Sequence, residues 1–187
     1  MLLKRLLFPF FYLLSHFCFS QVTFQKTYGG TLGDNANSFV KTADNNYVIV
    51  GNTSSFGVKP GATDVYLIKV DTIGRLLWTK TFGGQYGEDG RTLQQTSDGG
   101  YIIIGTTNDF SSGDYNIYLI KTDDKGNLQW SEILGGPSTD EGNDIQQTID
   151  GGYIIAGRTA SYGSGNSDGY ILKTNANGNL QWQYNYQ

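Results

Sequence analysis

Residues 95–105 read Gln-Thr-Ser-Asp-Gly-Gly-Tyr-Ile-Ile-Ile-Gly, a polar turn followed by an uninterrupted apolar run that ends at a glycine. The same pattern returns at residues 147–157, and again at residues 41–51, where Asn-Asn replaces the Gly-Gly pair. The apolar run predicts a β-strand that is covered on both faces, and Asp-Gly-Gly predicts the tight turn before it. One unit of sequence therefore occurs three times along the chain.

Other residues keep the same spacing and support the repeat. The tryptophans are 52 residues apart (130 − 78 and 182 − 130), and three lysines have the same spacing. The first copy is two residues longer, and the extra residues fall in the Gly-containing stretch 57–63, as a surface loop allows. The residues in register are Trp78, Trp130 and Trp182, and Lys69, Lys121 and Lys173.

Each unit contains the pattern of four short strands. In the second copy these strands are expected at residues 92–96, 101–104, 117–121 and 128–134, with polar or glycine-containing turns between them. The last strand alternates in character, which is typical of a half-buried strand at the outer edge of a sheet. No window of the sequence has a helical period of comparable quality.

Four strands in about fifty residues fit the blade of a β-propeller, whereas a β-solenoid has a shorter period for each coil. The sequence predicts an all-β fold of three four-stranded antiparallel blades in an open or incomplete arc, preceded by a signal peptide. The expected organisation is a signal peptide at 1–20 and a repeat domain at 21–187, which divides into an outer strand at 21–30 and repeats at 31–82, 83–134 and 135–187.

The first twenty residues have the parts of a secretory signal peptide. Lys4 and Arg5 precede an apolar run, and Ser20 supplies the small residue at the expected cleavage position. The run is short and interrupted for a membrane span, which needs about 20 apolar residues. The alternatives are a retained membrane anchor and a lipid anchor at Cys18, which Phe17 disfavours. We expect a secreted or cell-surface protein with no membrane contact after cleavage.

Removing the leader limits the available chemistry. Met1, His16 and Cys18 are the chain's only Met, His and Cys, so the chain from Gln21 onward contains none of these residues. This excludes Cys nucleophiles, Ser-His-Asp triads, disulfides and transition-metal sites with thiolate or imidazole ligands. Two of the 13 basic residues lie in the leader, so the net charge beyond it is 11 − 17 = −6, which argues against nucleic-acid partners.

A glycine lies four residues before each tryptophan, and an Asp or Asn lies three residues before that glycine. Such spacing predicts a tight hairpin in which the glycine adopts positive φ. The tryptophan then lies on the outgoing strand, where we expect it to be mostly buried between neighbouring units. The glycines are Gly74, Gly126 and Gly178.

The motif Asp-x-x-Gly-x-x-x-Trp resembles the tryptophan-docking motif of quinoprotein-type propellers. The spacing differs by one residue, so the resemblance implies a packing role and no quinone cofactor. The wider unit is similar to the tandem, kelch-like repeats of secreted and cell-surface proteins from Bacteroidota-like bacteria. That resemblance covers nearly the whole chain after the leader and implies propeller-like modules, which often have no assigned activity.

Acidic residues follow each Gly-Gly pair and are the candidates for a polar site. Calcium ligation and a carboxylate pair for glycoside hydrolysis are the functional interpretations, and a solvated turn repeated with its unit is the structural one. The pattern of an EF-hand loop is absent, and equivalent repeats do not offer the two different environments that acid–base catalysis needs. The calcium candidates are Asp34, Glu88, Asp89, Asp140 and Glu141.

Three aromatic residues recur beside the loops rich in Gly and Ser, namely Phe56, Phe110 and Tyr162. They are candidates for stacking on sugars or for plugging the end of a blade. We expect a non-catalytic module for protein or glycan contacts, without a cofactor. The alternative is a carboxylate-dependent propeller hydrolase acting on glycans, which we would expect to carry a long loop with unique polar residues.

The predicted outer strand at 21–30 cannot complete the blade of the third repeat, because that repeat already has its own outer strand. Three blades are also fewer than the four to eight of typical propellers. The natural object is therefore expected to be a longer protein or an assembly, with self-association through exposed blade ends.

Overall fold

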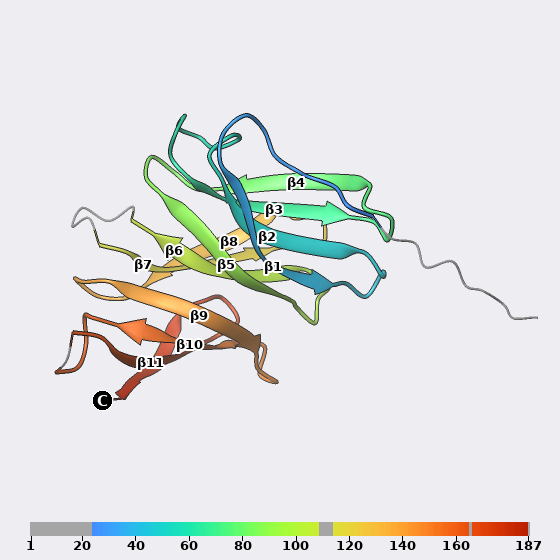
Figure 1. The fold of residues 1–187 in the computed structure, drawn as a ribbon. Coiled ribbons are helices and arrows are strands. Elements are labelled where there is room, and N and C mark those ends of the chain that lie inside the picture. The colour runs from blue at the N-terminus through green and yellow to red at the C-terminus, as the bar shows by residue number, and fades with distance from the viewer. Residues whose placement is uncertain (1–23, 109–113, 165, 187) are drawn as a thin grey trace, which may run out of the picture.

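The computed structural model describes residues 24–108, 114–164 and 166–186, and these form an all-β structure with three four-stranded antiparallel sheets. Within each sheet the strands pair in chain order, so every connection is a hairpin. Figure 1 shows the sheets following one another face to face. The first sheet contains β1 (Asp34–Lys41), β2 (Tyr47–Thr53), β3 (Asp64–Val70) and β4 (Leu76–Phe82); the second β5 (Glu88–Gln95), β6 (Tyr101–Thr107), β7 (Asn116–Thr122) and β8 (Leu128–Leu134); the third β9 (Asp140–Gln147), β10 (Tyr153–Thr159), β11 (Asp168–Thr174) and β12 (Leu180–Tyr186).

This arrangement confirms the predicted fold class of three blades in an arc that does not close. β5 contacts β1 and β2 of the sheet before it, and β9 contacts β5 and β6. The first strand of each sheet therefore lies on the inner side of the arc, and the fourth strand lies outside. The predicted signal peptide at 1–20 lies outside the described residues.

The core consists of two layers between successive sheets and a smaller cluster of Tyr66, Ile68 and Val70 on the first sheet. In the first layer, valine and leucine side chains of β2 and β3 pack against Leu93, Tyr101, Ile103 and Ile120 of the second sheet. The second layer is the equivalent contact between the second and third sheets. The central strands β6 and β7 are covered on both sides, which explains why residues 101–104 read as a continuous apolar run.

Each first strand carries a β-bulge at the same place in its repeat. The register shifts leave Asn37, Arg91 and Asn143 without a cross-strand partner. The backbone of the partner strand comes so close at this point that a Cβ on Gly105 would lie 2.1 Å from the carbonyl oxygen of Asp89. A bulge reorients the side chain of its extra residue, and Asn37 and Arg91 here reach groups of the following sheet.

The hairpin glycines Gly74, Gly126 and Gly178 have φ angles of 72°, 76° and 83°. The tryptophan of each sheet lies over the hairpin glycine of the next. A Cβ on Gly126 would lie 2.9 Å from Cη2 of Trp78, and a Cβ on Gly178 would lie 2.6 Å from Cζ3 of Trp130. Any side chain larger than hydrogen at Gly126 or Gly178 would meet the tryptophan ring.

Two sequence expectations were wrong in detail. Trp78 and Trp130 are half-buried, but Trp182 is 41% exposed, because no described sheet follows the third. The described part of the predicted outer strand, residues 24–30, forms no strand. These residues instead cross the open face of the first sheet, where Phe24 lies over Gly74 and the hydroxyl of Tyr28 donates to the Gly74 carbonyl at 2.6 Å.

Candidate functional site

A polar pocket of about 340 Å³ lies where the three sheets approach one another. Residues of all three sheets line it, from the strands and from the loops that lead into them. The bulged strand β5 supplies more of the lining than any other strand. The pocket is lined by Asn52, Thr63, Gly87, Glu88, Asp89, Arg91, Thr106, Tyr115 and Glu141.

The bulge in β5 places a guanidinium across the junction between the second and third sheets. Arg91 Nη1 donates to Glu141 Oε2 at 2.7 Å and to Asn143 Oδ1 at 3.1 Å. Arg158 Nη2 donates to the other oxygen of Glu141 at 2.8 Å. The bond from Arg158, followed by that from Arg91, lowers the pKa of Glu141, so this carboxylate is held ionised.

Asp89 is bound by two amide groups of the first sheet. Its Oδ1 atom accepts hydrogen bonds from Asn52 Nδ2 at 2.6 Å and from Asn37 Nδ2 at 3.1 Å. Asn37 is the bulge residue of β1, as Arg91 is of β5. Its bond to Asp89 is therefore equivalent to the bond from Arg91 to Glu141 between the next two sheets. The two carboxylates that face the pocket are therefore each oriented by donors from a neighbouring strand or sheet.

Tyr115 supplies an aromatic surface at the pocket. Its side chain is 45% exposed, and its carbonyl accepts a hydrogen bond from the Asp140 amide at 2.7 Å, which ties its backbone to the third sheet. An exposed ring beside amide, hydroxyl and carboxylate groups is an arrangement that can stack on a sugar and bind its hydroxyls.

Glu88 forms the inner wall of the pocket and is only 2% exposed. Its carboxyl accepts from the Gly84 amide and from the Thr107 hydroxyl, both at 3.1 Å. It also lies beside the buried Asp64, and Gly83 packs against both carboxyl groups. Burial, and then the neighbouring Asp64, raises the pKa of Glu88 to about 7.

The pair of carboxyl groups, Glu88 and Asp64, between the first and second sheets is not repeated between the second and third sheets. Asn116 takes the place of Asp64, and Asp140 takes the place of Glu88, so the second junction has one carboxyl group fewer. Oδ1 of Asp64 is buried and accepts no hydrogen bond from the described protein groups, as is also true of Asp140 Oδ1. A protonated Glu88 carboxyl can donate a hydrogen bond to a neighbouring acceptor, in keeping with its raised pKa.

The predicted acidic candidates divide into two groups. Asp34, Glu88 and Asp140 begin equivalent strands, and each accepts a hydrogen bond from the amide four residues earlier, at 2.7, 3.1 and 2.6 Å. They therefore brace the loops that begin with Gly-Gly. Asp89 and Glu141 line the pocket together with Glu88, whereas Asp34 and Asp140 do not line it. Among the described residues, no cluster of three or more His, Cys, Asp or Glu side chains is placed to hold a metal.

The predicted stacking residues lie away from this pocket. The ring of Phe56 packs on Tyr66 with centroids 5.5 Å apart, and that of Tyr162 packs on Tyr170 at 5.8 Å. Phe110 lies outside the described residues. Tyr115, which sequence reasoning did not single out, is the aromatic residue at the polar pocket.

Sequence reasoning also assigned no role to the repeated lysines, which are almost fully buried. Lys121 Nζ donates to Asp98 at 2.8 Å, to the Thr122 carbonyl at 2.9 Å and to Gln129 at 3.1 Å. Bonding to Lys121 lowers the pKa of Asp98 to about 2 against the opposing effect of its partial burial. Lys69 and Lys173 make the equivalent ion pairs with Asp44 and Asp150.

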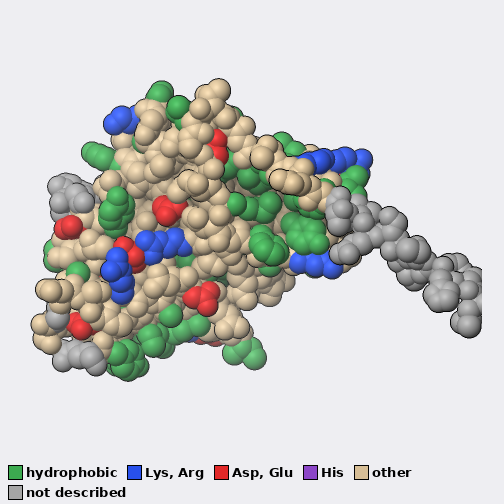
Figure 2. Space-filling view, viewed as in Figure 1, with side chains coloured by type: hydrophobic (Ala, Val, Ile, Leu, Met, Phe, Trp, Pro, Cys, Tyr) green, Lys and Arg blue, Asp and Glu red, His purple; other side chains and the backbone are tan. Residues whose placement is uncertain are grey.

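Charged side chains on the face seen in Figure 2 alternate in sign and form no extended basic patch. In the described part of the chain, no helix is long and apolar enough to cross a bilayer. No family model matches the chain. It is similar to the regulatory protein FlaEY of Caulobacter vibrioides, with 28% identity over 114 residues that cover 54% of this chain. The matched segment is 12% of the length of that protein.

Proposed function

We propose that this chain is a non-catalytic binding module, exported to the cell surface or beyond, and that its polar pocket binds a neutral glycan. The observation that carries the proposal is the pocket itself, which residues of all three sheets line and which includes the exposed Tyr115. The leader at 1–20 and the resemblance to secreted repeats support the location.

The charge of the pocket favours a neutral ligand. Besides the buried Glu88, the charged groups of the lining are the carboxylates of Asp89 and Glu141 and the guanidinium of Arg91, and Arg158 also binds Glu141. Asp89 and Glu141 already accept two or more hydrogen bonds each, so their positions are fixed while their remaining lone pairs can accept from sugar hydroxyls. A uronic acid would bring a carboxylate close to Asp89, whose donors are the uncharged amides of Asn37 and Asn52, and this disfavours its binding.

The alternative, a glycan hydrolase, is favoured by one observation. A carboxylic acid whose pKa is raised to about 7 is suited to general acid catalysis at neutral pH. The Glu88 carboxyl, however, is 2% exposed, and protein donors already occupy its oxygens. These contacts support a role in the junction between the first two sheets.

Binding to arrays of neutral and uronic-acid oligosaccharides, followed by calorimetry on the best neutral sugar, tests the proposal. We expect Tyr115→Ala to weaken that binding at least tenfold, because the stacking surface is lost. Tyr86→Ala is the matched control, since Tyr86 is 52% exposed and lies outside the pocket. Equal loss in both variants, or a preference for uronic acids, would contradict the proposal, and cleaved sugar in mass spectra would favour the hydrolase.

A further inference from the structure

The two contacts between sheets share one set of docking residues. Trp78 lies over Gly126 and beside Tyr101, with ring centroids 6.2 Å apart. Trp130 lies over Gly178 and beside Tyr153, at 6.0 Å. Each contact thus joins a tryptophan on the fourth strand of one sheet to a glycine and a tyrosine on the next.

Each end of the arc carries one half of this contact. On the third sheet the outward residues of β12 are all uncharged and between 41% and 60% exposed, whereas the equivalent rows on β4 and β8 include Lys80 and Glu132. These outward residues are Leu180, Trp182, Tyr184 and Tyr186. On the first sheet the matching half consists of Gly74 and Tyr47, which are equivalent to Gly126 and Tyr101.

The docking face of the first sheet, which contains Gly74 and Tyr47, is partly covered by the chain's own N-terminal segment. Phe24 occupies over Gly74 the place that Trp78 occupies over Gly126, and a Cβ on Gly74 would lie 2.5 Å from the Phe24 ring. Tyr28 packs on the apolar cluster of this face. Residues 24–30 therefore act as a cap on the docking face.

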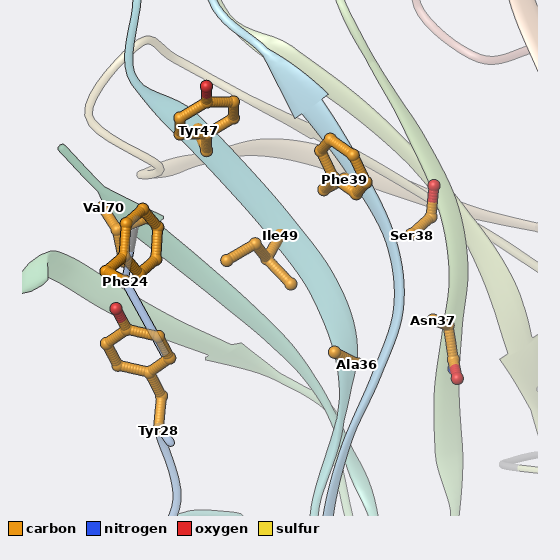
Figure 3. A pocket seen from close by; sticks show the side chains of 9 residues that line it. All are labelled: Phe24, Tyr28, Ala36, Asn37, Ser38, Phe39, Tyr47, Ile49 and Val70. Atoms are coloured by element: carbon orange, nitrogen blue, oxygen red, sulfur yellow. The ribbon is translucent and has the colours of Figure 1, made fainter. Parts of the chain in front are cut away.

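The cap leaves part of the face open. An apolar pocket of about 470 Å³ remains between Phe24 and Tyr28 on one side and Phe39 and Tyr47 on the other, with Ile49 between them (Figure 3). Phe39 is 68% exposed, whereas its equivalent in the second sheet, Leu93, is 7% exposed because the first sheet covers it. The open part corresponds to the area that the inner strands of a preceding sheet cover.

We propose that the third sheet of one copy docks head to tail on the first sheet of a second copy, with Trp182 replacing Phe24 over Gly74. This interface would repeat the two contacts between successive sheets that the chain already contains. The side chains that meet in it are apolar on both faces. The bulge contact is also compatible, because Asn143 and Asn35 are the residues equivalent to Arg91 and Glu141 and can form an amide–amide hydrogen bond.

Phe24 and Trp182 compete for one position, so the cap limits association. Opening the cap with Phe24→Ser should raise the association constant at least tenfold, measured by sedimentation velocity over a concentration series. The double variant Phe24→Ser/Trp182→Ser should return to the monomer, and Phe24→Ser/Tyr86→Ser, the matched control, should still associate. A monomeric Phe24→Ser variant, or association that survives loss of Trp182, would overturn the proposal.

Cysteine cross-linking tests the same geometry without removing the cap. Lys80 and Asn127 are hydrogen-bonded at 2.9 Å across the first junction, and their equivalents at the two ends are Tyr184 and Arg75. In a Cys18→Ser background, Tyr184→Cys/Arg75→Cys should form disulfide-linked dimers or higher oligomers on mild oxidation, more strongly with Phe24→Ser, and neither single-cysteine variant should do so. Cross-linking of equal extent in a single-cysteine variant would show a face-to-face contact and refute the head-to-tail arrangement.

Discussion

Because burial raises the pKa of Glu88, we expect the stability of this chain to depend on pH in a defined window. The folded state raises the pKa of Glu88 from an ordinary value of 4.5 to about 7. Between these two pH values the folded chain retains a proton that the unfolded chain has released. The free energy of unfolding therefore falls as the pH rises through this window, and the full contribution is present below pH 4.5.

The size of the effect follows from the difference between the two pKa values. At about 1.4 kcal/mol for each pH unit, a rise from 4.5 to about 7 corresponds to about 3 kcal/mol. Glu88→Gln removes the titration and keeps the shape of the protonated acid. Its amide can also donate to the buried Oδ1 of Asp64, which has no other donor among the described protein groups.

We therefore expect Glu88→Gln to unfold like the original chain at pH 4 and to be more stable at pH 8, by up to about 3 kcal/mol. Urea unfolding followed by tryptophan fluorescence at pH 4, 5, 6, 7 and 8 measures this difference. The matched control is Asp140→Asn, because Asp140 faces Asn116 and not a second carboxyl group. A stability difference that stays constant across the series, or a variant less stable than the original at pH 8, would refute the raised pKa of Glu88.

Two further predictions concern the repeated residues. Trp130→Ala should lower the free energy of unfolding by about 3 kcal/mol, because the ring fills the space between two sheets. Trp182→Ala should lower it by less than about 1 kcal/mol in the monomer, because this ring is exposed. Equal losses in urea unfolding would contradict the docking role of Trp130. Lys121→Met should lower the free energy of unfolding by about 3 kcal/mol at neutral pH, because it leaves Asp98 and a buried carbonyl without their donor. At pH 1, where Asp98 is protonated, this loss should be smaller. Thermal unfolding at both pH values tests this, and an equal loss at both would show that the ion pair contributes nothing.

The architecture was readable from the sequence because every repeat presents the same signals three times. The apolar run at 101–104 predicted a covered strand, and the glycine at Gly126 predicted a hairpin with positive φ. The insertion at 57–63 was expected in a loop and lies between β2 and β3. Local turn chemistry and strand periodicity do not depend on distant contacts, so sequence patterns report them directly.

The polar pocket was only partly predictable. Its acidic residues were singled out, but the sequence does not tell that Glu88 turns inward to Asp64 while Asp89 and Glu141 turn toward the pocket. That division depends on the contacts between strand ends of neighbouring sheets. A signal for the inward residue was available, because Gly-Gly followed four residues later by an acid occurs in all three copies.

The sequence analysis missed the bulges. The hydrophobic pattern of the inner strands is weak, so one extra residue does not visibly disturb it. The sequence analysis gave Arg91 no role, yet the bulge directs its side chain across a junction to Glu141. The displaced N-terminal segment has a similar cause. Residues 24–30 have the alternation of a strand, but no described strand lies beside them to pair with.

A crystal structure of the chain with the neutral oligosaccharide that binds it most tightly would test the central claim most directly. We expect one sugar ring to lie on Tyr115, with its hydroxyls donating to Asp89 and Glu141, and the oligosaccharide to be intact. A sugar bound elsewhere, for instance against Phe56 or Tyr162, or a cleaved product in the pocket, would contradict the proposed binding module.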